Sequence, residues 1–203
     1  MSQSIGTEGK NEAPPPQWRG ADGSRLEGFT GRRFAPHRWF VSLAKLLTRG
    51  RSYEVFRGLS YSRRAFRPYV AFNARLMPFG KLPRRDTELL ILRVAWVCGS
   101  LYEWHQHLPF GRSAGLGETD IERIKVGPGA DGLGDRDRTL LTACEELLTE
   151  HVISGGTWAA LRPLLDDAQI VELCMLVGNY AMLAGTLNSL GVQLEAPLAR
   201  RLT

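Results

Sequence analysis

Apolar residues that recur every three or four positions from about Arg38 onward place the strongest limit on what this chain can fold into. This spacing aligns them along one side of an α-helix. The chain lacks the strict alternation typical of β-strands and the residue pairs of tight hairpin turns. We therefore expect an all-α fold of about seven or eight helices between residues 38 and 190. The expected helices cover about residues 39–47, 62–77, 83–98, 100–114, 118–126, 135–151, 158–161 and 170–187, with Asp166 and Gln169 forming a capping box before the last.

The first 33 residues differ in composition from the rest of the chain. They are rich in Gly, Pro, Ser and charged residues and include three consecutive prolines, Pro14 to Pro16. Such segments seldom bury enough apolar surface to fold, so we expect a flexible tail over residues 1–33. Trp18 and Phe29 are the tail residues that could dock on a neighbouring surface. Residues 34–203 are long enough for one helical domain with its own core, and no long linker divides them.

Charge and cysteine content narrow the classes of function. Between residues 19 and 75 the chain has 13 arginines and lysines but only three acidic residues. No nucleic-acid-binding motif accompanies this excess, so we interpret it as a solvated helical surface and expect no nucleic-acid partner. No run approaches the roughly 18 apolar residues of a membrane-spanning helix, so we expect no membrane association. Three cysteines without a CxxC pair, and an N-terminus without an apolar signal core, favour a cytoplasmic protein.

Three acid–base candidates lie within 20 residues of one another: Glu88, Glu103 and His107. Glu103 and His107 are four residues apart and share one face of a helix. A carboxylate in that position can orient the imidazole ring and raise its basicity. Glu88 comes from the preceding apolar helix, where a carboxylate has either a partner or a raised pKa. Its candidate ion-pair partners are Arg84, Arg85 and Arg93.

Metal and cofactor binding have weaker support in the sequence. Glu103, His105 and His107 alternate at every second position, which suits a strand and not the helix expected here. A helical pair would be Glu103 with His107, and Glu88 would have to supply the third ligand. The glycine-rich segment 127–134 lacks the Lys-Ser/Thr ending of a phosphate-binding loop. We therefore expect no metal and no cofactor.

Four segments in this order resemble the carboxymuconolactone decarboxylase and alkyl hydroperoxidase D-like family: residues 82–95, 102–107, 114–116 and 171–180. The resemblance covers about residues 38–195. It implies the helical fold of that family and self-association as a dimer, trimer or hexamer through apolar helices.

The hydroperoxidase branch of that family has a glutamate, a CxxC motif and a histidine four residues after the second cysteine. Glu88 and His107 match the glutamate and the histidine. Ser100 and Glu103 stand where the two cysteines would be, and neither can form or resolve a disulfide. We therefore do not expect thiol-dependent peroxidase cycling. The decarboxylase branch has a glutamate four residues before a histidine, which Glu103 and His107 match.

Three functions remain open. The first is a cofactor-free acid–base enzyme acting on a small organic acid or carbonyl compound by decarboxylation, lactone or enolate chemistry. In it, His107 transfers the proton, Glu103 orients His107, and a protonated Glu88 donates to a developing oxyanion. The second is peroxidase activity through the single cysteine Cys98, and the third is a non-catalytic oligomeric protein whose Glu/His cluster is structural. For the enzyme, the expected substrate-binding residues are Ser100, Tyr102, Trp104 and Arg93. Arg93 could bind a substrate carboxylate, and Arg112 is a second candidate for that role. Further residues that could line the pocket are Trp96, Asn179 and Tyr180.

Overall fold

The computed structural model describes residues 18–19, 23–26 and 54–194, and within these ranges it contains eight helices and no strands. The all-α expectation is therefore confirmed. The helices are α2 (Glu54–Leu59), α3 (Arg63–Leu76), α4 (Arg84–Val97), α5 (Leu101–Ser113), α6 (Glu118–Val126), α7 (Asp135–Thr149), α8 (Gly155–Leu161) and α9 (Asp167–Leu190). The helix expected at residues 39–47 lies outside the described residues. The short helix α2 was not expected.

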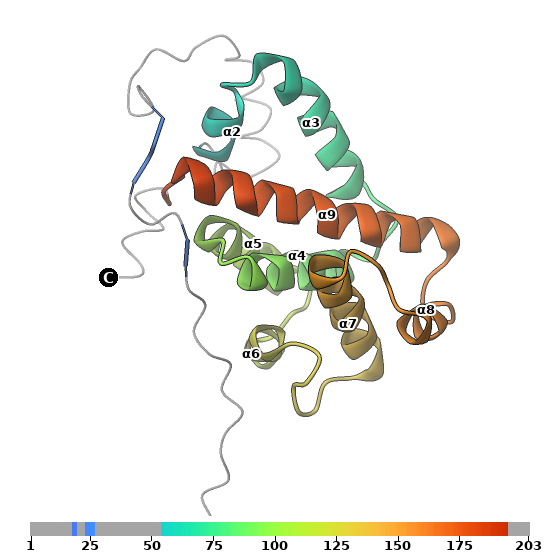
Figure 1. Cartoon of the computed structure of the whole chain (residues 1–203). Coiled ribbons are helices and arrows are strands. Elements are labelled where there is room, and N and C mark those ends of the chain that lie inside the picture. The colour runs from blue at the N-terminus through green and yellow to red at the C-terminus, as the bar shows by residue number, and fades with distance from the viewer. Residues whose placement is uncertain (1–17, 20–22, 27–53, 195–203) are drawn as a thin grey trace, which may run out of the picture.

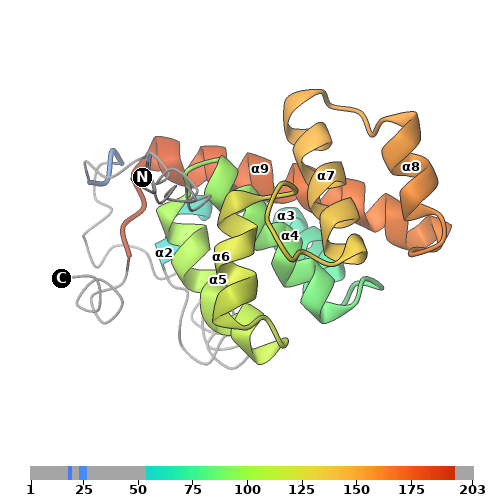
Figure 2. The ribbon, with the colours of Figure 1, turned by 90° about the horizontal axis from the view of Figure 1, so that it is seen from below.

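Helix α4 forms the centre of the core. All its residues from Asp86 to Ala95 are buried, because α5, α6, α7 and α9 all pack around it. Helix α9 separates α2 and α3, on one of its sides, from α4 to α7 on the other (Figure 1). Figure 2 shows α7 and α8 gathered at the N-terminal end of α9. The run of apolar residues 89–92 and the apolar residues 94 and 95 cover every side of α4, and they need this kind of enclosure to be buried.

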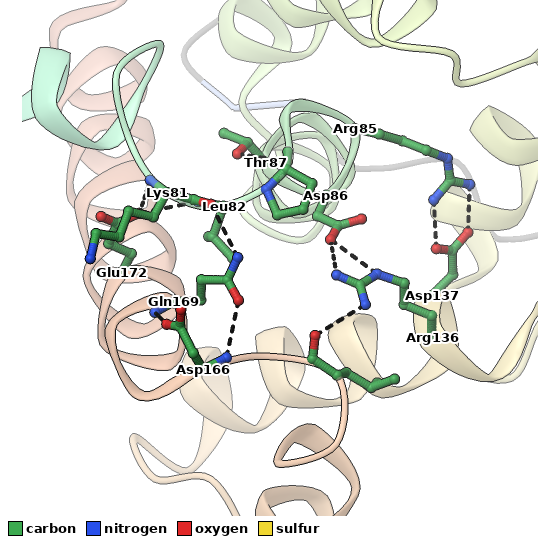
Figure 3. Close-up of polar contacts among 12 residues, drawn as sticks. Lys81, Leu82, Arg85, Asp86, Thr87, Arg136, Asp137, Asp166, Gln169 and Glu172 are labelled. Carbon is green, nitrogen blue, oxygen red and sulfur yellow. Dashed lines mark hydrogen bonds and ion pairs between the residues drawn. The ribbon is translucent and has the colours of Figure 1, made fainter.

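Charged side chains fix the N-terminal end of α4 to its neighbours (Figure 3). Arg136 of α7 donates to Asp86 Oδ2 from Nε at 3.1 Å and from Nη2 at 2.6 Å. Arg85 donates both of its Nη groups to the two carboxylate oxygens of Asp137, at 2.6 and 2.7 Å. From α9, the Glu172 carboxylate accepts from the backbone N–H groups of residues 81 and 82. These contacts set the position of α4, and therefore of the Glu88 side chain less than one turn further on.

The start and end of α9 follow local sequence signals. Asp166 and Gln169 form the expected capping box, in which each side chain accepts from the backbone N–H of the other residue, at 2.8 and 3.0 Å (Figure 3). Gly191, which has a φ of 63°, caps the C-terminal end of the helix. A Cβ atom at this position would lie 2.0 Å from the carbonyl oxygen of Gly23, so glycine is required both by conformation and by close approach.

Part of the N-terminal segment packs on the domain. The Trp18 ring lies 5.5 Å from that of Trp96 and 6.4 Å from that of Trp104. The backbone N–H of Arg19 donates to Gly99 at 2.9 Å, and that of Arg25 donates to Leu190 at 3.0 Å. Trp18, one of the two tail residues expected to be able to dock, therefore packs on the domain, and an aromatic cluster and backbone hydrogen bonds hold residues 18–19 and 23–26. The other residues of the segment 1–33, including Phe29, lie outside the described residues.

Helix α9 meets the length and composition of a membrane-spanning helix, although no such segment was expected. Half of its apolar stretch is buried inside the protein, against partners that include α3, α4 and α7. Burial in the core of the domain accounts for that part of its apolar character.

Candidate functional site

Glu88 and His107 meet between α4 and α5, and Glu103 lies one turn before His107 on α5. Glu88 comes from α4, whereas Glu103 and His107 come from α5, and their exposed fractions are 0%, 2% and 7%. A short turn that includes Gly99, with a φ of 62°, leads the chain from α4 into α5. Gly111 follows His107 by about one turn, and a Cβ atom there would lie 3.0 Å from Leu92 Cδ1. The missing side chain lets α5 approach α4 closely enough for their polar groups to meet.

Glu88 joins two partners through its two oxygens. Oε2 lies 2.8 Å from Nδ1 of His107, and Oε1 lies 2.6 Å from Nη2 of Arg84, one turn earlier in α4. A carboxylate can only accept, so we assign the proton of the neutral imidazole to Nδ1. Nε2 then carries the lone pair and is the nitrogen able to take up a proton. The sequence-based assignment of Glu103 as the orienting carboxylate is therefore wrong, since Glu88 has that contact.

Glu103 is a buried carboxyl group without a partner. Neither of its oxygens has a hydrogen bond among the described residues. Burial raises the pKa of Glu103 from its ordinary 4.5 to about 8, and the nearby Ser100 hydroxyl opposes this shift without reaching hydrogen-bond geometry. Glu103 therefore carries a proton at neutral pH and can donate it. The role of protonated donor, which the sequence had suggested for Glu88, belongs to Glu103.

Helices α3 and α9 add polar groups to this site. The Tyr180 ring lies edge-on to His107, with centroids 5.3 Å apart. Asn179 donates from Nδ2 to Asn73 Oδ1 at 2.7 Å. Burial raises the pKa of Tyr69, which the charge of Glu103 raises further and a contact with Asn179 lowers. Tyr180 therefore lies against His107, and Asn179 lies beside Tyr69.

Tyr69 and Asn73 were missed by the sequence analysis. Both lie on α3, where Phe66 and Leu76 are the buried residues. The spacing of 66, 69, 73 and 76 places all four on one helix face. Two polar residues on an otherwise buried face were the signal that could have identified them.

Two of the expected substrate-binding residues of α5 point elsewhere. Tyr102 accepts a hydrogen bond from the backbone N–H of Val55 at 3.3 Å, which ties α5 to α2. Trp104 packs in the aromatic cluster with Trp18 and Trp96, whose ring lies 4.9 Å away. Residues 102 and 104 each lie about 100° around the helix from residue 103, so neither shares the Glu103 face. Ser100, at the N-cap of α5, does lie beside Glu103.

The two arginines expected to hold a substrate carboxylate are engaged by the protein. Arg93 donates from Nε to Glu145 at 2.8 Å and from Nη1 to the carbonyl oxygens of residues 124 and 125, both at 2.7 Å. Through these contacts Arg93 holds the C-terminal end of α6 in place. The exposed Arg112 is paired with Glu118. The proposed carboxylate-binding role of Arg93 and Arg112 is therefore unsupported, because their donors already have partners.

The three cysteine thiols are poorly suited to nucleophilic chemistry. Burial, helped by the charge of Glu103 and opposed by Arg19, raises the pKa of the Cys98 thiol to about 11. Burial also raises the pKa values of Cys144 and Cys174. The reactive thiolate form is therefore scarce at neutral pH. Within the described part of the chain, no group of three or more His, Cys, Asp or Glu side chains is arranged to hold a metal ion.

Part of the chain matches the model of a known family. Residues 63–146 match the model of the carboxymuconolactone decarboxylase family, and this segment contains Glu88, Glu103 and His107. The resemblance expected from the sequence is therefore confirmed. The comparison with curated proteins found no match.

Three solved structures share the fold. A peroxidase-related protein from Silicibacter sp. TM1040 has a TM-score of 0.73 at 13% identity, with 87% of this chain and 94% of that chain covered. The alkylhydroperoxidase AhpD core of a peroxidase-related protein from Ralstonia eutropha JMP134 has a TM-score of 0.69 at 16% identity, with 79% and 86% covered. A protein of unknown function from Agrobacterium tumefaciens, a candidate antioxidant defence protein AhpD, has a TM-score of 0.61 at 19% identity, with 68% and 94% covered. At these identities the similarity establishes the fold alone.

Proposed function

We propose that this chain, whose residues 63–146 match the carboxymuconolactone decarboxylase family, is an acid–base enzyme that moves a proton on a carbon next to a carbonyl group. The observation that carries the proposal is the buried Glu88–His107 pair, at 2.8 Å, beside the unpartnered carboxyl group of Glu103. A base whose tautomer is fixed and an acid that holds its proton at neutral pH are the two groups that such a reaction needs. The proposed step requires no cofactor.

His107 acts first in the proposed reaction. Its Nε2 takes a proton from the carbon beside the carbonyl group, and the electron pair left on that carbon moves into an enolate. Glu88 stabilises the imidazolium that forms, and Arg84 offsets the charge of Glu88 through its contact at 2.6 Å. A positioned general base of this kind contributes about 10²- to 10⁴-fold in rate.

Glu103 stabilises the enolate by donating a hydrogen bond to its oxygen. A donor aimed at a developing negative charge in a buried site is worth more than the same donor in water. His107 then returns the proton to a different carbon, which completes the isomerisation of an unsaturated lactone with no net change in atoms. In a decarboxylation, the bond to the carboxylate breaks instead, carbon dioxide leaves with the electron pair remaining on carbon, and the enolate takes a proton from the site.

The proposed partners are a small-molecule substrate and further copies of the same chain, as a dimer, trimer or hexamer. Cytoplasmic location and the lack of a nucleic-acid or membrane partner remain expectations from the sequence. Peroxidase activity through Cys98 has less support, because the thiol is held in its neutral form.

The proposal is tested with α-angelica lactone, a small β,γ-unsaturated lactone whose isomerisation requires removal and return of one proton. Isomerisation and deuterium incorporation in heavy water are followed by NMR. We expect turnover by the wild-type protein and a loss of at least about 100-fold in His107→Ala, because the base is removed. His105→Ala is the matched control: it removes a half-buried histidine from another face of α5, and we expect it to retain the activity.

Two results would contradict the enzyme. One is a wild-type rate no higher than that of buffer, and the other is an equal rate in wild type and His107→Ala. If the wild-type protein is inactive and His107→Ala also breaks the oligomer in size-exclusion chromatography, the Glu88–His107 pair is structural.

A further inference from the structure

Buried oxygen atoms without hydrogen bonds gather at one place in the protein. Among the described residues, Tyr69 Oη, Ser100 Oγ, Asn179 Oδ1 and both carboxyl oxygens of Glu103 are buried and have no partner. They come from α3, α5 and α9, and the charge of Glu103 acts on Tyr69 directly. Ser100, Glu103 and Asn179 are only 0%, 2% and 5% exposed. Tyr69 approaches Asn179, and Ser100 approaches Glu103, so we treat these five atoms together and call them the oxygen cluster.

Such a cluster is costly for a protein to keep empty. More than about 90% of buried polar groups in folded proteins have a partner. Each one without a partner costs about 1–3 kcal/mol in desolvation. Neither the approach of Tyr69 to Asn179 nor that of Ser100 to Glu103 reaches hydrogen-bond geometry. The cluster therefore points to a polar molecule that binds to it.

The chemistry of the oxygen cluster limits what that molecule can be. Tyr69, Ser100 and the protonated Glu103 are three O–H donors, which suit a carbonyl or hydroxyl oxygen. The Asn179 amide is oriented by its Nδ2 donating to Asn73, which leaves Oδ1 as an acceptor. Within the described part of the chain no cation is bonded to the cluster, and Arg84 is already matched by Glu88. A carboxylate bound here would be a buried charge without compensation.

We propose that the oxygen cluster binds an uncharged carbonyl compound, such as a lactone, ester or enone, whose carbonyl oxygen accepts hydrogen bonds from Tyr69 and Glu103. This assignment rests on the proposed function, and it names the substrate class of the same site. Of the two reactions proposed above, it favours isomerisation over decarboxylation, because a substrate that loses carbon dioxide must carry a carboxylate. Tyr69 and Asn179 become specificity residues, supplied by α3 and α9, that complete the site of α4 and α5.

The test compares two probes that share one lactone ring and differ in charge: (5-oxo-2,5-dihydrofuran-2-yl)acetic acid, which is an anion at pH 7, and its uncharged methyl ester. Binding of each to the full chain is measured by calorimetric titration and by NMR, without turnover. We expect the ester to bind at least about tenfold more tightly than the acid. Equal or tighter binding of the acid would overturn the assignment and indicate Arg84, whose Nη1 has no hydrogen-bond partner among the described residues, as an anion site. Failure of both probes to bind at millimolar concentration would also overturn it.

A hydroxyl deletion provides the second measurement. Tyr69→Phe removes one donor to an uncharged acceptor, so we expect it to weaken ester binding by about two- to tenfold. Tyr61→Phe, in the loop before α3 and at the protein surface, is the matched control and should leave ester binding unchanged. An unchanged ester affinity in Tyr69→Phe, in protein whose circular dichroism matches the wild type, would contradict the assignment.

The two proposals fail in different ways. Tight ester binding without isomerisation of α-angelica lactone would refute the proton-transfer function and leave the substrate class standing. Isomerisation by a protein that prefers the acid would refute the substrate class and leave the proton-transfer function standing.

Discussion

Replacement of Glu103 by glutamine should make the protein more resistant to unfolding as the pH rises. In the unfolded chain Glu103 loses its proton near pH 4.5, whereas in the folded protein burial holds the proton until about pH 8. Between these values the unfolded state binds fewer protons, so the stability of the wild-type protein falls with increasing pH. At about 1.4 kcal/mol per pKa unit, the gap corresponds to an upper limit of about 5 kcal/mol. Glutamine does not titrate, so it removes this loss.

The assay is urea unfolding followed by circular dichroism at pH 5, 6, 7 and 8, for the wild type and Glu103→Gln. The buried amide of glutamine adds a cost of about 1–3 kcal/mol that does not depend on pH. We therefore expect the variant to be equal to or less stable than the wild type at pH 5, and to gain at least about 2 kcal/mol relative to it by pH 8. The charge of Glu103 acts on Tyr69, Tyr180 and Cys98, and these groups do not ionise in this range, because burial raises their pKa values.

Glu150→Gln, at the exposed end of α7, is the matched control and should change stability by less than about 0.5 kcal/mol at each pH. Stability curves for wild type and Glu103→Gln that run parallel from pH 5 to pH 8 would refute the argument. They would mean that Glu103 is ionised in the folded protein, and the proposed hydrogen bond from Glu103 to an enolate oxygen would then lose its basis.

Two further predictions concern the N-terminal segment and the thiol. Trp18→Ala should lower the free energy of unfolding by about 1–2 kcal/mol, because it removes a half-buried ring from Trp96 and Trp104. Trp158→Ala, at an exposed site, is the control and should change it little. Equal thermal melting of wild type and Trp18→Ala would refute the packing. The wild-type protein should not reduce cumene hydroperoxide in the presence of dithiothreitol above the rate in buffer, since a pKa of about 11 leaves roughly one Cys98 in ten thousand as thiolate at pH 7. Turnover that disappears in Cys98→Ser would show the opposite.

Local sequence signals predicted the helices well and the short or docked segments poorly. The apolar spacing identified α3 to α9, and Asp166 with Gln169 identified the start of α9. Helix α2 has only six residues, which is too short for a periodic pattern to be seen. The docking of Trp18 depends on Trp96 and Trp104, which are about 80 residues away in sequence. The sequence therefore indicated Trp18 as a residue that could dock, but not the surface on which it docks.

The candidate site, too, could be predicted from the sequence only in part. The sequence identified Glu88, Glu103 and His107, but it paired Glu103 with His107 because four-residue spacing was the only contact rule available. The actual partner of His107 is Glu88, 19 residues earlier and on another helix, so the pairing depends on how α4 packs against α5. That packing also determines which carboxyl group is left without a partner. The exchange of roles between Glu88 and Glu103 is therefore a property of the tertiary structure.

The enclosed position of α4 has a consequence for how the protein opens. Since residues 86–95 are all buried, we expect the backbone amides of α4 to exchange with deuterium only when the whole domain unfolds. Helix α3 packs mainly on α9, and most of its residues are exposed, so its amides should exchange through a smaller, local opening. Glu88 would then stand on the most persistent part of the molecule and Tyr69 on a part that detaches more readily. Local detachment of α3 would give a small molecule a way to the buried side chains without unfolding of the core.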